Sequence, residues 1–417
     1  MTRTGVPRPG HEWVYLLWSM TLIAISCASA NAQTPSAKAD TTSSWDVVGV
    51  PLLSFTSDRG TGYGAYGAAF LRGHVNPDQK APYNLSFGGQ FYQTTGGYAF
   101  HKFLFDIPNV AKSGVRVDLD SGYETWDSAW YFGQGNRLPR LRPESTPDKY
   151  YTFNAESLWI VPNVRIPLNQ TLWLFTGLVF RKTQIDVYPD TKLAEDNPTG
   201  LDGGYLNQLQ LGIMLDTRNR EPDTQSGVFS EISARFAHRL TGSDYSMWGF
   251  NTTHRQWHSL TENKSLVLAV RLGLDIQGGS LPFFHQHILG GSQRVEVGGN
   301  VALRGFPNGR FRGNATLYNN TELRWTFLSL SRARSTYAFL LVPFFDLGRV
   351  WLHGENDDFT HLHGSIGSGL RFVYDSVFVV RFDVASALEE FQDSERPGQL
   401  EQRGFVMGIY AIVNHPF

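Results

Sequence analysis

The chain has 417 residues with a formal net charge of −2, and charged residues make up 18% of it. This near-neutral balance argues against a nucleic-acid-binding protein, which usually carries a basic surface. The mean hydropathy of −0.25 argues against a protein of membrane-spanning helices, because each needs about 20 consecutive apolar residues. Aromatic residues (14%) and glycine (42 residues) are abundant, which is typical of an all-β protein with many turns.

The first segment has the features of a cleaved secretory signal. Two arginines precede an apolar stretch, and Ala30-Asn31-Ala32 matches a small-residue cleavage site. We expect residues 1–32 to form a signal peptide and residues 33–44, which are small and polar, to form a flexible leader. A lipoprotein site at Cys27 and an uncleaved anchor helix are the alternatives. Because Cys27 is the only cysteine, removal of the signal leaves no thiol.

From Trp45 to Phe417 the sequence consists of segments of about ten residues that alternate in hydrophobicity, separated by Gly, Asn, Asp and Pro turns. In the segment 266–275, one strand face holds only Leu and Val, and the other includes Arg271 and Asp275. A soluble β-sandwich shares this alternation. Charge and glycine on the polar faces, aromatic residues at strand ends and the export signal favour a membrane barrel.

We therefore predict an all-β fold, a transmembrane antiparallel β-barrel of about 16 strands over residues 45–417. An even strand number is expected of a single-chain barrel. Short turns such as Asn169-Gln170 alternate with long polar loops such as Gly278–Arg312. In outer-membrane barrels the short turns face the periplasm and the long loops face the outside.

Four motifs follow one another in the C-terminal half of the chain. They are Gly290-Gly291, Leu303-Arg304-Gly305-Phe306, Asn320-Thr321-Glu322-Leu323-Arg324 and Phe344-Phe345-Asp346-Leu347-Gly348. In this order they resemble the signature of the BamA/TamA family of outer-membrane proteins, the bacterial surface antigen barrels. A looser match at Asp216-Thr217-Arg218 and a glycine-rich first hairpin extend the resemblance over nearly all of the chain.

The resemblance implies that the long loop folds back into the barrel, where Arg304 pairs with Asp346 and has Glu322 as a second anion. Leu303, Gly305 and Phe306 would form the loop tip, and Gly348 would accompany Asp346 on the wall. Strand alternation independently points Asp346 and Glu322 into the lumen. Arginine suits such a site because its planar guanidinium can bind a carboxylate through two hydrogen bonds. Without the resemblance, Arg304 would be interpreted as an ordinary solvated loop residue.

Phe417 is the last aromatic residue of the sequence and resembles the insertion signal of outer-membrane barrels; coincidence is the alternative. Two His-x-His pairs, His285 with His287 and His361 with His363, could each share a strand face. No third ligand is placed by the sequence, so we predict no metal and no other cofactor. The sequence has no G-x-S-x-G motif and no spacing that indicates a catalytic triad. We therefore expect no enzyme.

Members of the family insert barrel proteins into the outer membrane, or help proteins or lipids to cross it, and receive clients through periplasmic POTRA domains. About a dozen residues separate the signal from the first strand, too few for an independent domain, so we expect no POTRA domain here. The resemblance thus implies an outer-membrane barrel that assists insertion or translocation of proteins or lipids. The expected partners are outer-membrane lipid, the barrel assembly machinery and a separate periplasmic protein. A structural surface-antigen barrel and a passive pore are the alternatives.

Overall fold

The computed structural model describes residues 43–56, 60–73, 79–136, 149–293, 295–332, 335–353, 362–388, 407–413, 415 and 417. The expected signal peptide and most of the expected leader lie outside the described residues. The strands are β1 (Ser44–Thr56), β2 (Gly60–Arg72), β3 (Leu85–Thr94), β4 (Tyr98–Ile107), β5 (Arg116–Trp130), β6 (Thr152–Pro167), β7 (Leu172–Asp186), β8 (Gly204–Tyr205), β9 (Gln208–Asp216), β10 (Gly227–Ala237), β11 (Met247–Ser259), β12 (Leu266–Gly279), β13 (Ile288–Leu289), β14 (Val295–Glu296), β15 (Ala315–Arg332), β16 (Ser335–Trp351), β17 (His363–Tyr374), β18 (Phe378–Ala387) and β19 (Met407–Val413).

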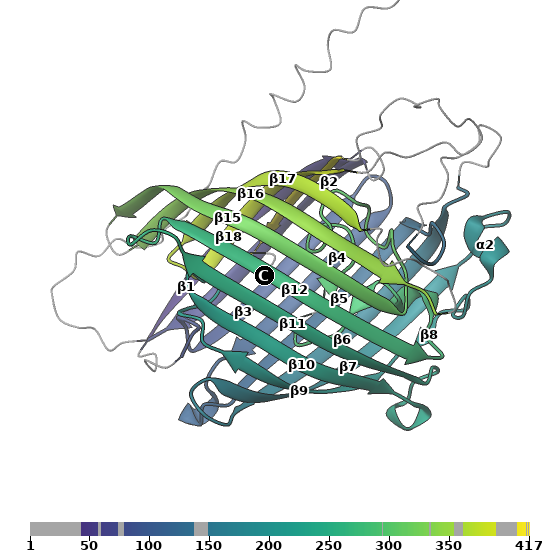
Figure 1. Ribbon diagram of the computed structural model, residues 1–417, viewed down its shortest axis with the longest axis horizontal. Helices are drawn as coiled ribbons and strands as arrows, with labels where there is room; N and C mark the ends of the chain where they lie inside the picture. Colours follow the sequence, from purple (N-terminus) through teal and green to yellow (C-terminus); the bar gives the residue numbers. More distant parts are fainter. Residues whose placement is uncertain are drawn as a thin grey trace, which may run out of the picture.

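These strands form a barrel wall in which each strand pairs antiparallel with the next one along the chain. One 17-stranded sheet includes the two-residue strand β8, which pairs only with β7. Sixteen long strands among the described residues therefore make the wall, and the prediction of an all-β barrel is confirmed. Figure 1 shows the strands running obliquely around a common axis. β13 and β14 form a separate small hairpin.

In the part of the chain that the structure describes, helices occur only in connections between strands. The helices are η1 (Val110–Lys112), α2 (Lys192–Asp196), η2 (Arg239–Thr241) and η3 (Phe283–His285). Within the described ranges, no helix is long and apolar enough to cross a membrane.

The two ends of the barrel differ in their connections. We call the end where β1 begins and β19 finishes the turn end, and the opposite end the loop end. The connections 187–207 and 280–314 leave from the loop end. At the turn end, the connection 217–226 reaches a distant segment, where the Glu221 N–H donates to the Lys80 carbonyl at 3.1 Å. The Glu221 carboxylate also accepts from Arg116, at the start of β5, at 2.9 Å.

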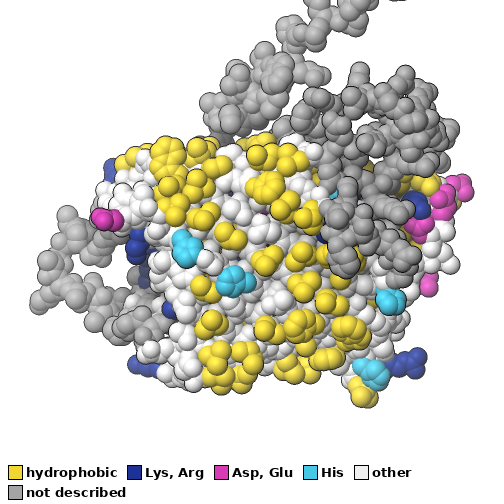
Figure 2. Space-filling model, viewed as in Figure 1, with side chains coloured by type: hydrophobic (Ala, Val, Ile, Leu, Met, Phe, Trp, Pro, Cys, Tyr) yellow, Lys and Arg dark blue, Asp and Glu magenta, His cyan; other side chains and the backbone are white. Residues whose placement is uncertain are grey.

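The wall is apolar outside and polar inside, as the alternation in the sequence predicts. Leu211, Ile213 and Leu272 are about half exposed on the outer face, whereas Arg271 and Asp275 are buried in the lumen. Figure 2 shows hydrophobic side chains across the strand wall and charged side chains gathered toward its two ends. This arrangement is the reverse of a soluble sandwich and is that of a barrel in lipid.

The wall has one seam, between the first and last strands. Among the described residues, ladders join every consecutive pair of wall strands, and none joins β19 to β1. Pro51 lies within β1, opposite Ala65 in an unbroken ladder with β2. Proline has no backbone N–H and is tolerated in a strand where that position faces no partner. We therefore infer that the backbone nitrogen of Pro51 faces the seam.

Candidate functional site in the barrel lumen

The connection between β12 and β15 folds into the lumen and is held there along its length. The Gly290 N–H donates to the Asp275 carboxylate at 2.9 Å, and that carboxylate also binds Arg235 at 2.7 Å. A Cβ on Gly290 would lie 2.1 Å from the Arg235 guanidinium. The Ser292 N–H donates to Glu231 on β10 at 2.8 Å. The Gly290-Gly291 motif thus lets the descending chain approach charged side chains of the wall.

The loop tip has an unusual backbone conformation at two positions. Leu303 and Gly305 have φ values of 54° and 97°. A Cβ on Gly305 would stand 3.0 Å from the backbone of β18 at Ala387, so both the angle and the space require glycine. Phe306 is buried and its ring lies 5.3 Å from that of Phe311. The tip is therefore a packed element of the lumen.

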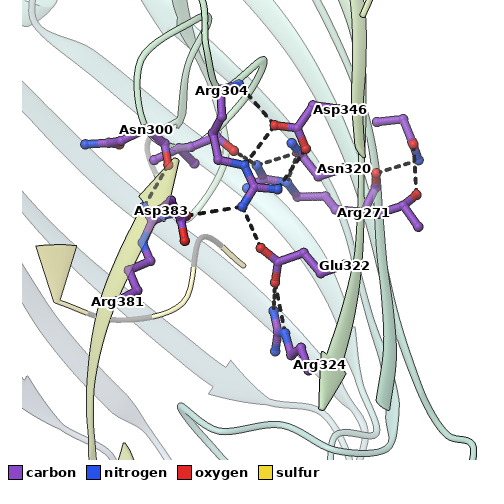
Figure 3. Close-up of polar contacts among 12 residues, drawn as sticks. Arg271, Asn300, Arg304, Asn320, Glu322, Arg324, Asp346, Arg381 and Asp383 are labelled. Carbon is purple, nitrogen blue, oxygen red and sulfur yellow. Dashed lines mark hydrogen bonds and ion pairs between the residues drawn. The ribbon is translucent and has the colours of Figure 1, made fainter. Parts of the chain in front are cut away.

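Arg304 is fully buried between carboxylates of the wall (Figure 3). Its Nε and Nη2 donate to the two oxygens of Asp346 on β16, each at 2.8 Å. Its backbone N–H donates to Asp346 at 3.0 Å. Its Nη1 donates to Glu322 on β15 at 2.7 Å and stands 3.4 Å from Asp383 on β18. The structure therefore brings Arg304, Asp346 and Glu322 together.

Further arginines surround these carboxylates. The Nε of Arg324 donates to Glu322 at 2.9 Å, Arg381 donates to Asp383 at 2.8 Å, and Arg371 on β17 contacts both acids. A larger set of buried charges results, which we call the lumenal network. It consists of the acids Glu322, Asp346 and Asp383 and the arginines Arg271, Arg304, Arg324, Arg371 and Arg381.

The lumenal network holds more arginines than acids, and carbonyl oxygens of the loop accept from two of the arginines. Arg271 donates to the Val301 carbonyl at 2.6 Å, and Arg381 donates to the Asn300 carbonyl at 2.7 Å. Both carbonyls belong to the loop. The arginines of the wall therefore hold the loop backbone, while Arg304 of the loop is held by the acids of the wall.

Burial alone would lower the pKa of Arg304, but the carboxylates of Asp346, Glu322 and Asp383 outweigh burial and raise it. The guanidinium therefore stays charged. It also stacks on the ring of Phe344, with Cζ 3.5 Å from the ring centroid, a position in which a cation gains from the aromatic quadrupole.

Gly348 makes room for the tip. A Cβ at this position would lie 2.8 Å from the Leu303 side chain, which is buried beside β16. The structure thus places Gly348 against Leu303 rather than in contact with Arg304.

Phe417 lies inside the lumen and outside the last strand, which ends at Val413. Its ring is 6.4 Å from that of Trp257, with the guanidiniums of Arg271 and Arg324 at 4.9 and 5.2 Å. Its carbonyl accepts from Arg324 at 3.0 Å. His415 precedes it, with its side chain 2% exposed. The sequence pattern gave no sign of this inward turn.

The histidine pairs take part in loop packing. His285 shares a hydrogen bond with Gln208 at 3.0 Å, and His287 shares one with Arg312 at 2.8 Å. Burial, followed by the charge of Arg312, lowers the pKa of His287 to about 3. His363 contacts the Asn136 carbonyl at 2.9 Å, and His361 lies outside the described residues. In the described part of the chain, no group of three or more His, Cys, Asp or Glu could hold a metal ion.

Sequence reasoning missed the roles of Asp383, Arg371 and Phe344. Their inward positions follow from strand alternation, because Arg371 pairs with Arg381 and Phe344 with Glu322 in the ladders. Their contact with Arg304 depends on where a long loop places its tip. Alternation cannot supply that position. The arrangement has the chemistry of an anchor, since Arg304 of the loop is bound by carboxylates of the wall.

A family model described as the Omp85 superfamily domain matches residues 79–409. No curated protein matches the chain. Among solved structures, BamA from Haemophilus ducreyi lacking POTRA domains 1-3 matches with a TM-score of 0.52 and 16% identity, over 90% of this chain and 70% of that one. CdiB from Escherichia coli matches with a TM-score of 0.50 and 12% identity, over 89% of this chain and 62% of that one. At these identities the likeness is one of fold.

Proposed function

This chain belongs to the Omp85 superfamily, and from that premise we propose that it assists the insertion or translocation of proteins or lipids at the outer membrane. It is an outer-membrane β-barrel. The observation that carries the proposal is the combination of a lumen occupied by an anchored loop with a wall that has no ladder between β19 and β1 among the described residues.

The occupied lumen favours this role over a passive pore. The tip residues Leu303, Arg304 and Phe306 are each at most 1% exposed. A solute passing through the lumen would have to displace a packed element held by several charged hydrogen bonds. Sideways passage of a protein or lipid through the seam, which we call lateral exchange, does not require the loop to move. Only the facing edges of β19 and β1 must separate.

The proposed domain plan is a signal peptide over 1–32, a leader over 33–44 and a barrel from 45 onward. β1 starts at Ser44, which is the last residue of the proposed leader. The proposed partners are outer-membrane lipid, the barrel assembly machinery during the insertion of this chain, and a separate periplasmic protein. Phe417 would serve as the insertion signal before folding. No chemical step is part of the proposal.

The proposal can be tested by locking the seam. The only cysteine of the sequence, Cys27, falls in the proposed signal peptide, so an engineered cysteine pair would meet no competing thiol. A variant that combines Val48→Cys on β1 with an introduced cysteine on β19, chosen within disulfide reach across the seam, would join the two strands when oxidised. We expect reconstituted wild-type barrel to accelerate the folding of a urea-denatured outer-membrane barrel protein into vesicles. The oxidised pair should lower that rate at least tenfold, and reductant should restore it.

A matched control joins two strands that are already paired. Val48 and Ala68 are ladder partners on β1 and β2, so Val48→Cys with Ala68→Cys should oxidise without loss of rate. Full activity in the locked seam variant would contradict lateral exchange. If wild-type barrel folds the client no faster than empty vesicles do, a structural surface-antigen role replaces the proposal.

A further inference from the structure

The outer face of β11 carries a row of polar side chains. His254, Gln256 and His258 alternate with the buried lumenal residues Arg255 and Trp257, so they point away from the lumen. His254 and His258 are exposed, and Gln256 is half-buried. We call His254, Gln256 and His258, together with Ser230 on β10, the outer polar row.

The outer polar row lies inside the apolar wall. Along β11, Phe250 precedes it with 39% exposure, and Leu260 follows it with 53% exposure. On the neighbouring strands, Leu272 stands opposite His254, and Ile232 stands beside Ser230 on the outer face of β10; they are 48% and 56% exposed. Figure 2 shows histidine side chains in cyan within this hydrophobic wall. Polar groups facing hydrocarbon are costly unless they have a partner.

Hydrogen bonds within the row fix the direction of its donors. Ser230 Oγ lies 2.8 Å from His254 Nδ1, and His254 Nε2 lies 3.3 Å from Gln256 Oε1. Gln256 Nε2 contacts His258 Nε2. With neutral imidazoles, each bond has one consistent donor: Ser230 donates to His254, His254 to Gln256, and Gln256 to His258.

This chain of hydrogen bonds leaves two N–H donors at the end that is formed by Gln256 and His258. They are the Nδ1–H of His258 and the second amide hydrogen of Gln256, and neither has a partner among the described residues. His258 is one residue from the end of β11 at the turn end of the barrel. Bonds in a chain polarise one another, which strengthens the terminal donors. The row therefore presents donors where the wall approaches the membrane surface.

An apolar groove of about 720 Å³ lies beside the row. It runs over the outer faces of β7, β9 and β10, where Leu174, Ile213 and Ile232 are exposed lining residues. The small side chain of Ala234 leaves space within it. Ser230 both lines the groove and begins the polar row. One ligand with a polar end and a long apolar part could thus contact both features.

We propose that the outer polar row and this groove form a binding site for a membrane glycerophospholipid. The phosphate oxygens accept from His258 and Gln256, and one acyl chain fills the groove. Phosphate suits the two donors because its oxygens are acceptors only. A protein strand is a poorer occupant, because β11 is paired on both edges and offers no free backbone edge. Lipid surrounds this wall in any outer-membrane barrel.

The test measures retention of palmitoyl-oleoyl phosphatidylglycerol by the full-length barrel, titrated in detergent and followed by native mass spectrometry. The variant His254→Leu/Gln256→Leu/His258→Leu replaces the row with apolar residues suited to the lipid face. We expect its affinity for the tightest-bound phosphatidylglycerol to fall at least fivefold. The control His101→Leu removes a histidine stacked on Phe91, at 4.5 Å, on the outer wall of β4, and should bind like wild type.

Two further measurements distinguish the contribution of the headgroup to lipid binding from that of the groove. Diacylglycerol with the same chains lacks the phosphate, so it should bind wild type and the triple variant equally weakly. Ala234→Phe should fill the groove and weaken phosphatidylglycerol binding while the polar row stays intact. Heat-modifiability on gels shows whether each variant folds, and His258→Leu alone replaces the triple variant if that one does not.

Three outcomes would overturn the proposal. They are equal phosphatidylglycerol affinity in wild type and a folded row variant, equal binding of diacylglycerol and phosphatidylglycerol to wild type, and a wild-type dimer in nanodiscs that the triple variant abolishes. The last result would show that a second copy of the chain covers the row. None of these outcomes depends on client folding, so they leave the proposed function untouched.

Discussion

Arg304 is the residue on which the position of the loop tip depends. It faces three buried carboxylates, and its guanidinium is both bidentate to Asp346 and stacked on Phe344. Lysine would supply the charge but neither the planar fork nor the stacking. Removing one partner of a buried ion pair leaves an uncompensated charge in a poorly solvated place, which costs more than the pair itself contributes.

We expect Arg304→Ala to lower the free energy of unfolding by about 3–5 kcal/mol, because it leaves Asp346, Glu322 and Asp383 without their shared cation. Asp346→Asn should destabilise the barrel less. Urea titration in lipid vesicles, read by loss of the heat-modifiable band, measures both effects. Since the two side chains form one unit, the double variant should lose less than the sum of the single losses. A strictly additive double variant would show that the two residues act independently.

The inward direction of these residues could be predicted from the sequence, and their partners only in part. Alternation places Glu322, Asp346 and Arg324 in the lumen without any reference structure. The pairing of Arg304 with Asp346 came from a resemblance of motifs, since a loop residue has no alternation to orient it. Asp383 lies 79 residues beyond Arg304 in the chain, and nothing local in the sequence joins them.

At the scale of elements, the two described residues after β19, His415 and Phe417, form a lumenal tail rather than an extension of the strand. Its His415 is buried, and its Nε2 stands 3.7 Å from the Asp223 carboxylate. Asp223 belongs to the connection 217–226, so the tail and this connection meet at the turn end. Burial, followed by the charge of Arg324, lowers the pKa of His415 to about 4.

This pKa makes the tail sensitive to acid. The unfolded histidine titrates near 6.5, so the folded tail binds fewer protons between pH 6.5 and about 4. Its contribution to stability is complete above pH 6.5 and is lost as the pH falls toward 4. We expect a loss of about 2 kcal/mol from pH 7 to pH 5. Hydrogen exchange of the peptide 407–417, corrected for intrinsic rates, should rise accordingly. In His415→Gln this acid-dependent rise should be absent; if it persists, another group is responsible.

The lumenal loop predicts the electrical behaviour of the barrel. Wild type should give no large, steady conductance in planar bilayers, because the loop occupies the lumen. Arg304→Ala should give frequent channel openings, since the tip then loses the charged bonds that hold it to the wall. Leu240→Ala, at a 92% exposed position outside the strands, is a matched control and should stay silent. Steady wild-type channels would contradict an occluding loop.

For the whole molecule, the sequence predicts the barrel well because the membrane requires the alternation of apolar and polar residues that the sequence shows. Each wall strand must alternate, and an Arg or Lys on the lipid face near mid-membrane costs about 2–4 kcal/mol. That rule finds the sixteen wall strands and their faces. The inward tail and the outer polar row both depart from it. His254 and His258 occupy lipid-facing positions that alternation assigns to apolar residues, so the general pattern could not reveal their purpose.

The anchoring of Arg304 also bears on the mechanics of the wall. Through Glu322, Asp346 and Asp383, and through Arg371, one loop residue links four consecutive strands, β15 to β18. These four strands are held together through Arg304 and should resist bending. The strands at the seam, β19 and the glycine-rich β1–β2 hairpin, are not linked by Arg304. The two strands that border the seam, β19 and β1, should therefore deform more easily than β15 to β18, which should move together as one rigid group.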